Sequence, residues 1–246
     1  MGKFDYGPLK ESADLWIALD VAGKRLLSAS GTDGKVREYL VERGSSSYVF
    51  DFAKREGTRS NHANDLFWVI PDKRIALRGL QYTFSFPFNE RGDTYRLGFD
   101  KKVPDVVARG PGTSILFIAF KDWMLRDAET GMLIKSWTDG PRLASLGRVD
   151  KHAADYNAKR DVWAMGASQS ELTTTGGTTG LSVTGLLVLV DGKTGDALRV
   201  IKVGKRIVQC VKISSDGKYV CAANDKDELC IWKLDELLKP AADAQP

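Results

Sequence analysis

The stretch "VQCVKISSDGKYVCAANDKDELCIWKL", from Val208 to Leu234, decides the fold that the sequence predicts. Apolar and polar residues alternate in "VQCVKIS", in "KYVCAAN" and in "LCIWKL", and the turns "SDG" and "DKDE" separate these three runs. Alternation with a period of two residues between Asp- and Gly-rich turns is typical of short antiparallel strands. The stretch therefore predicts three strands of a meander.

Similar units recur along the chain. Leu15 to Leu40, "LWIALDVAGKRLLSASGTDGKVREYL", matches the C-terminal stretch turn for turn. Weaker copies occupy three further segments, Asp65–Phe88, Asp105–Trp137 and Arg160–Val203. Self-similarity at a spacing of roughly 40 residues is the signature of a repeat architecture. Five aromatic residues fall inside the expected strands, and we expect most of them in the core between units: Trp16, Phe67, Trp68, Trp123 and Trp163.

Two of the units share a turn signature. "DAETG" occupies Asp127 to Gly131, and "DGKTG" occupies Asp191 to Gly195. An Asp carboxylate accepts hydrogen bonds from backbone amides across such a turn, Thr adds a weaker bond, and Gly tolerates a positive φ. These turns, with "AGK", "PDK" and "SDGK", are expected to be structural.

On these residues the chain resembles the WD-repeat β-propeller family. The resemblance is carried by "SSDGKYVCAAN", by "LCIWKL" with Trp232, by "VREYL" with Tyr39, and by "WMLRDAETG". The WD dipeptide is absent, because Lys233 follows Trp232 and Leu40 follows Tyr39, and the GH dipeptide is absent too. The side-chain tetrad of well-formed family blades therefore has no place in this sequence, and the resemblance implies a divergent propeller.

The predicted fold class is all-β, a β-propeller of about five four-stranded blades. The units begin near Leu15, Leu66, Val103, Leu143 and Ile207, and the last one has only three strands. Family members close the ring by mixing the two ends of the chain in one blade, so Lys3–Gly7 is the expected fourth strand. Residues 1–240 would form one WD-repeat-like propeller, followed by a flexible tail at 241–246. A β-sandwich or an open sheet is the alternative.

The connections between blades carry basic residues. In a propeller, the turns that join the fourth strand of one blade to the first strand of the next lie on one face, together with the turns between second and third strands. The candidate partner-binding residues on that face are Lys54, Arg55, Arg59, Lys101, Lys102, Arg142, Lys205 and Arg206. They predict a basic face for an acidic partner; the alternative is that they are ordinary solvated loop residues.

A polar segment interrupts the fourth unit. "QSELTTTGGTTGLSVTG", Gln169 to Gly185, is rich in Thr and Gly and is predicted to be a long, flexible loop on the basic face. Long loops in compact domains are usually functional or disordered. We expect this loop to gate the face in part.

Catalytic and metal-binding motifs are not found in the sequence. Cys210, Cys221 and Cys230 form no CxxC pair, and we expect them to be buried thiols. The sequence contains no GxSxG elbow, P-loop or HExxH motif, so no catalytic, cofactor or metal residue is assigned. His152, with Asp150 and Asp155 nearby, is expected in a solvated loop; the alternative is a general base with an orienting carboxylate.

The predicted function is that of a non-catalytic protein–protein interaction scaffold, a subunit of a larger intracellular assembly. The alternative is a propeller enzyme or small-ligand binder, hydrolase- or lactonase-like, that uses a central channel. Nucleic acid is another acidic partner, but the chain has no RNP aromatic pattern or zinc-finger spacing. No run reaches the roughly 18 apolar residues of a membrane span, and a signal peptide is missing, so a cytoplasmic or nuclear location is expected, with organelle import left open.

Overall fold

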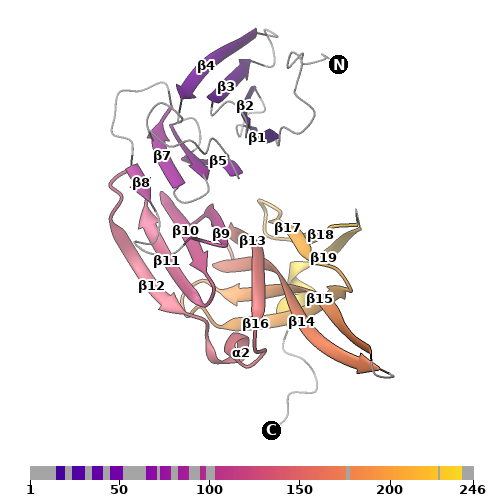
Figure 1. The fold of residues 1–246 in the computed structure, drawn as a ribbon. Helices are drawn as coiled ribbons and strands as arrows, with labels where there is room; N and C mark the ends of the chain where they lie inside the picture. Colours follow the sequence, from indigo (N-terminus) through magenta and orange to yellow (C-terminus); the bar gives the residue numbers. More distant parts are fainter. Residues whose placement is uncertain are drawn as a thin grey trace. The chain divides into compact units, whose positions relative to one another are not determined.

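The computed structural model describes residues 15–19, 24–30, 35–40, 45–51, 65–70, 73–78, 83–88, 95–97, 103–175, 178–226 and 228–239. The described chain is almost entirely β-structure, arranged as successive antiparallel sheets (Figure 1). It divides into two compact units, each described by itself. The first comprises 1–103, 112–115 and 126–132, and the second comprises 104–111, 116–125 and 133–246.

The first unit contains the first two sheets and one end of the third. The first sheet is formed by β1 (Leu15–Leu19), β2 (Arg25–Ser30), β3 (Lys35–Leu40) and β4 (Ser45–Asp51). The second is formed by β5 (Asp65–Ile70), β6 (Arg74–Arg78), β7 (Thr83–Pro87) and β8 (Tyr95–Leu97). These two sheets share one apolar core, in which Leu27, Trp68 and Phe86 are buried.

The third and fourth sheets are also four-stranded. The third contains β9 (Val106–Arg109), β10 (Ser114–Ala119), β11 (Asp122–Asp127) and β12 (Leu133–Thr138). The short helix α2 (Pro141–Ala144) leads into the fourth, which contains β13 (Val149–Asn157), β14 (Val162–Thr175), β15 (Thr178–Asp191) and β16 (Ala197–Gly204). All six residues of β10 are buried.

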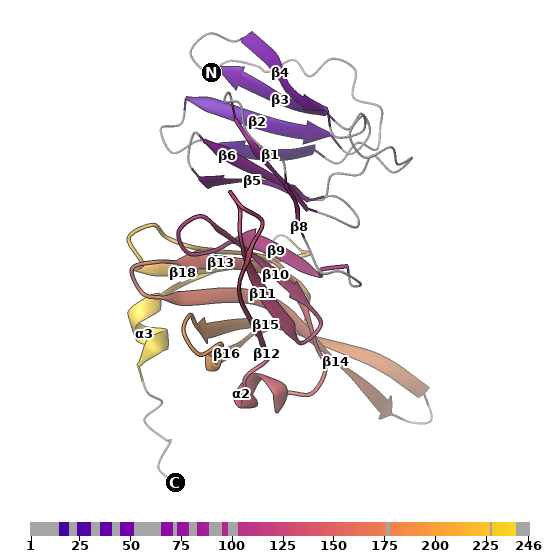
Figure 2. The ribbon, with the colours of Figure 1, turned by 90° about the vertical axis from the view of Figure 1, so that its left-hand side faces the viewer.

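The fifth sheet has three strands. They are β17 (Val208–Ile213), β18 (Tyr219–Asn224) and β19 (Leu229–Lys233), and the helix α3 (Leu234–Leu238) follows them (Figure 2). The predicted meander in Val208–Leu234 is therefore confirmed. The expected closing strand at Lys3–Gly7 lies outside the described residues, as does the tail at 241–246.

Large aromatic side chains fill the core of the second unit, as the sequence predicts. Trp123 and Trp163 are fully buried in a cluster contributed by the third and fourth sheets. A second cluster lies against β17 and β18, where Val211 and Val220 are buried. Within each unit, neighbouring sheets thus share buried apolar side chains, as stacked repeats require.

Three predictions about strands and cysteine burial are wrong. Strand β13 begins at Val149 and not near Leu143. Leu143 belongs to the helix α2, which precedes the strand and is favoured by Pro141 in its first turn. Cys210 is exposed and Cys221 and Cys230 are half-buried. In β18 it is Val220, Ala222 and Asn224 that face inward, so Cys221 lies on the opposite face. The third error concerns Gln169–Gly185.

The segment Gln169–Gly185 is a β-hairpin and not a loop. β14 and β15 pair continuously from Val162↔Asp191 to Thr175↔Thr178. β13 pairs with β14 only as far as Gln169, and β16 pairs with β15 only from Gly185 onward. The hairpin arm, whose described residues are 170–175 and 178–184, therefore extends beyond β13 and β16 as a two-stranded ribbon (Figure 1). Thr is a good strand former, which the interpretation as a flexible loop overlooked.

Candidate binding site

A pocket of about 260 Å³ opens in the second unit, where the β10–β11 turn meets the connection from β12 to β13. In each sheet, the turn between the second and third strands lies at the same end as the start of the first strand, because the strands are antiparallel. The pocket therefore lies at the end that the sequence analysis assigned to binding. Its lining residues are Phe120, Lys121, Thr138, Asp139, Ala144, Gly147, Val149 and Lys151.

A buried ion pair forms the base of the pocket. Lys151 Nζ lies 2.9 Å from Asp139 Oδ2, and the Lys151 side chain is only 2% exposed. Lys151 Nζ also donates to the Phe120 carbonyl oxygen, and Trp123 Nε1 donates to Asp139 Oδ1 at 2.6 Å. A buried charge is tolerated only when it is paired and hydrogen-bonded. The network satisfies both charges and connects three segments, which are β13, the end of β12 and the β10–β11 turn.

The network joins residues that the sequence analysis did not connect. The sequence predicts no tetrad of the WD-repeat kind, and the structure has a Lys–Asp pair with Trp123 as the indole donor. The signal in the sequence was the position of Lys151 in "VDKHAADYN". Its neighbour at spacing two, Val149, is an inward-facing residue of the same strand, so Lys151 is inward-facing too. A Lys at such a position requires an acidic partner.

Phe120 holds an unusual backbone conformation at the rim of the pocket. β10 and β11 are joined by the two residues Phe120 and Lys121, and Phe120 has φ of 55°. Two-residue hairpin loops usually place Gly or Asn at such a position, because a bulky residue is strained there. The strain is offset locally, since the Phe120 amide donates to Asp105 Oδ2 at 2.6 Å and its carbonyl accepts from Lys151.

His152 lies in a strand, so its predicted place in a solvated loop is wrong. The register shifts between Lys151 and Ala153, which makes His152 the extra residue of a β-bulge in β13. Its Nε2 lies 2.7 Å from Ser168 Oγ. Burial lowers the pKa of His152, although the nearby carboxylates of Asp150 and Asp105 oppose this shift.

A serine hydroxyl beside a neutral imidazole is the arrangement of a nucleophile and its base. The Ser168 residue, however, is 3% exposed and pairs with Asp150 in the interior of the fourth sheet. A buried hydroxyl offers a substrate no approach, so this geometry favours a structural role for the His152–Ser168 pair. Among the described residues, no group of three or more His, Cys, Asp or Glu could hold a metal ion.

The opposite ends of the sheets are occupied by the predicted Asp–Thr–Gly turns. Asp191 Oδ1 accepts from the Lys193 and Thr194 amides and from Thr194 Oγ1, at 2.7–3.0 Å. The bond from the Thr194 amide is the largest of the effects that lower the pKa of Asp191. Gly195 has φ of +75°, so the predicted role of each residue in the signature is confirmed.

Asp127 forms the same turn in the third sheet. Its Oδ1 accepts from the Glu129 and Thr130 amides at 3.0 and 2.8 Å, and Gly131 has φ of +72°. Burial alone would raise the pKa of Asp127, but hydrogen bonds from Thr113 and Thr130 outweigh burial and lower it.

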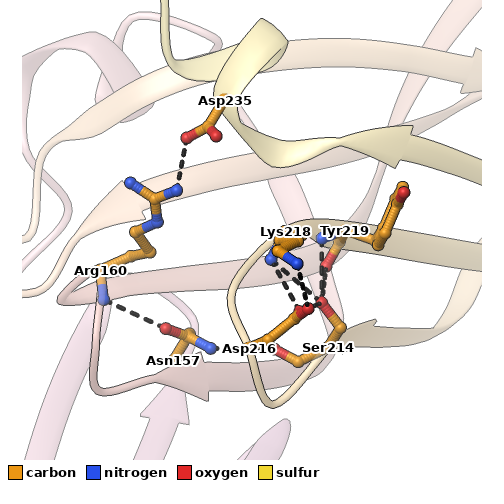
Figure 3. A network of polar contacts seen from close by, with 7 residues as sticks. All are labelled: Asn157, Arg160, Ser214, Asp216, Lys218, Tyr219 and Asp235. Atoms are coloured by element: carbon orange, nitrogen blue, oxygen red, sulfur yellow. Dashed lines mark hydrogen bonds and ion pairs between the residues drawn. The ribbon is translucent and has the colours of Figure 1, made fainter.

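A polar network joins the fourth and fifth sheets at this end (Figure 3). Asn157 Nδ2 donates to the Ser214 carbonyl at 3.0 Å, and Arg160 Nη2 lies 2.6 Å from Asp235 Oδ1 in α3. Ser214 Oγ donates to Asp216 Oδ1 within the "SSDGK" turn. These groups bond to one another, which agrees with a structural role for this end.

Five of the eight predicted partner-binding residues lie outside the described residues: Lys54, Arg55, Arg59, Lys101 and Lys102. Arg142 lies in α2, where Nη1 donates to the Leu198 carbonyl at 3.0 Å. Lys205 and Arg206 are exposed in the connection from β16 to β17. None of these three lines the pocket, and the basic residues that do, Lys121 and Lys151, were missed by the sequence analysis.

Comparison with known proteins identifies the fold. No family model matches the chain, and no curated protein matches it. Among solved structures, the chain is similar to a Kuenenia stuttgartiensis hydrazine synthase, with a TM-score of 0.63 and 11% sequence identity. The match covers 90% of this chain and 65% of that chain, so this chain spans about two thirds of that protein's length.

The fold is a β-propeller arrangement. At 11% identity the likeness shows the fold alone. Together with four four-stranded sheets and a three-stranded fifth among the described residues, it confirms the predicted fold class of about five blades. WD-repeat membership stays a prediction. Within the described part of the chain, no helix has the length and apolar character that crossing a bilayer demands.

Proposed function

We propose that the chain is a non-catalytic protein–protein interaction scaffold and works as a subunit of a larger assembly. The observation that carries this proposal is the hairpin arm, residues 170–184. Leu172 and Leu181 are cross-strand partners on the arm, and they are 76% and 65% exposed. A propeller blade needs no such extension for its own core, so a second role is the simplest reason for the arm.

The energetics of the arm favour a partner. An isolated two-stranded ribbon is marginally stable in water at best. Among the described strands of the fourth sheet, β13 and β16 pair with the hairpin no further than Gln169 and Gly185, and the apolar pair Leu172 and Leu181 is exposed. Burying both leucines against a partner would contribute about 1.5–3 kcal/mol each. Docking would therefore stabilise the arm and the assembly together.

The arm is tested by shortening it. Residues 171–182 are replaced by Asn-Gly, so that a two-residue turn closes on the Ser170↔Val183 pair. We expect the variant to keep its melting temperature and to lose its partners when complexes are purified from the native source and quantified by mass spectrometry. The double variant Leu172→Ser/Leu181→Ser should give the same loss.

A matched control lies one position away. Glu171 and Ser182 are cross-strand partners on the opposite face of the arm, and both are exposed. Glu171→Ala/Ser182→Ala should leave the partner set unchanged. A partner set that survives removal of the arm would refute the assignment of docking to this element.

The basic face remains part of the proposal. Lys205 and Arg206 are exposed, and they lie at the same end of the fourth sheet as the arm. Reversing Lys101, Lys102, Lys205 and Arg206 to Glu should weaken binding of an acidic partner and reduce its dependence on salt. If partners bind these variants equally well, the basic face has no role in docking.

A further inference from the structure

We infer that the pocket at Lys151 binds a short carboxylate, a site separate from the hairpin arm. Its volume of about 260 Å³ is below the roughly 300–1,000 Å³ of pockets for drug-sized ligands. The pocket therefore suits a molecule of a few carbon atoms or a single side chain. Two lysines, Lys121 and Lys151, line this small space together with one carboxylate, that of Asp139.

The hydrogen-bonding capacity that is left in the pocket is mainly that of donors. The Lys151 ammonium has three protons, and two of them go to the Phe120 carbonyl and to Asp139 Oδ2. Among the described residues, no acceptor takes the third, and none takes a proton from the exposed Lys121 ammonium or the Thr138 hydroxyl. Both oxygens of Asp139 already accept, one from Trp123 and one from Lys151.

The charges and walls of the pocket define the ligand. The lining residues carry two ammonium groups and one carboxylate, a net positive charge that suits a monoanion, and the Asp105 carboxylate at the rim already accepts from the Phe120 amide. A phosphate dianion would have to lie against Asp139. Phe120, a residue that is 57% exposed, and Val149 supply apolar walls. A Cβ at Gly147 would meet no atom within 4 Å, so the space beside it is open. A carboxylate on a short aliphatic chain matches the positive charge and the apolar walls.

The same chemistry has two sources, a free short-chain acid and the Glu side chain of a partner protein. The test titrates butyrate and butyramide into the full-length protein, and separately a blocked Ala-Glu-Ala tripeptide and its Ala-Gln-Ala counterpart. Binding is followed by the NMR signal of the Trp123 indole N–H, because this group bonds to Asp139 at the base of the pocket. Butyrate and the Glu peptide should shift this signal, and the two amides should not.

Lys121→Ala is the informative variant, since Lys121 lies in an exposed turn and its loss leaves the buried ion pair intact. Removing this exposed ammonium should lower the affinity for the carboxylate about two- to fivefold, the range expected for an exposed ion pair. Lys159→Ala, another exposed lysine in a hairpin turn, should change nothing.

A higher affinity for butyrate than for the Glu peptide identifies a free acid as the ligand, and the reverse order identifies a Glu side chain of a partner protein. Either result supports the site. Equal binding of carboxylate and amide, an unchanged affinity in Lys121→Ala, or no shift of Trp123 with any ligand would overturn it.

Discussion

Replacing Lys151 with Met tests whether the buried ion pair holds β13 to its neighbours. The substitution keeps an unbranched side chain and removes the charge, so Asp139 is left with Trp123 as its donor in a site where its side chain is 13% exposed. Removing one partner of a buried pair costs about 3–5 kcal/mol, because the other charge stays buried without compensation. For a chain of this length, such a loss lowers the melting temperature by roughly 2–4 °C per kcal/mol.

The double variant makes this prediction specific. Asp139→Asn keeps an oxygen for Trp123 but leaves the Lys151 ammonium without its counter-ion. We expect Lys151→Met/Asp139→Asn to be less destabilised than the sum of the two single variants, by about 2 kcal/mol or more. Urea unfolding, followed by tryptophan fluorescence and by far-UV circular dichroism, gives the four free energies of unfolding. Additivity within about 0.5 kcal/mol would refute the coupling.

Three further predictions concern the turns and the bulge. Asp191→Ala removes an acceptor of three hydrogen bonds and should destabilise the protein by about 1–2 kcal/mol at pH 7. The loss should be smaller in acid, because the stability that comes from a lowered carboxyl pKa disappears as the pH falls. Urea midpoints at pH 7 and pH 3 check this, and an equal loss of stability at both would contradict it. Burial lowers the pKa of His152, so the neutral side chain contributes its full stability above about pH 6.5 and less below that pH. His152→Gln should therefore reduce the change in melting temperature between pH 7 and pH 5. An unaltered pH dependence would contradict this. Gly195→Ala should lower the melting temperature more than Gly112→Ala does, because both glycines have positive φ but only a Cβ at position 195 would clash with Trp137 Nε1. Equal losses would show that the contact relaxes.

The repeat pattern was the most predictable part of the molecule. Turn residues such as Asp191 and Gly195 interact with residues only a few positions away in the sequence, so their roles can be deduced from the local sequence. The strand pattern of Val208–Leu234 is local in the same sense. The boundaries of the first, second and fifth sheets follow from these signals.

The pocket was less predictable because it depends on residues that are distant in sequence. Lys151 finds its partners at Asp139 and Phe120, which belong to other strands and turns, and no spacing rule connects them. Likewise, the pairing of the arm depends on a register of 14 residues per strand, in which repeated Thr and Gly resembled a linker. The sheet face taken by Cys210 was obscured by the register shift between Val208 and Cys210.

In the five sheets of the described residues, each strand pairs with the strand that precedes or follows it in the chain. Such short-range pairing keeps the entropy of loop closure small, so each meander can form without waiting for distant segments. During synthesis, which delivers about 5–20 residues per second, a sheet can therefore assemble soon after its last strand leaves the ribosome. The order of biogenesis would then follow the order of the sheets, and the three-stranded fifth sheet would be the last to form.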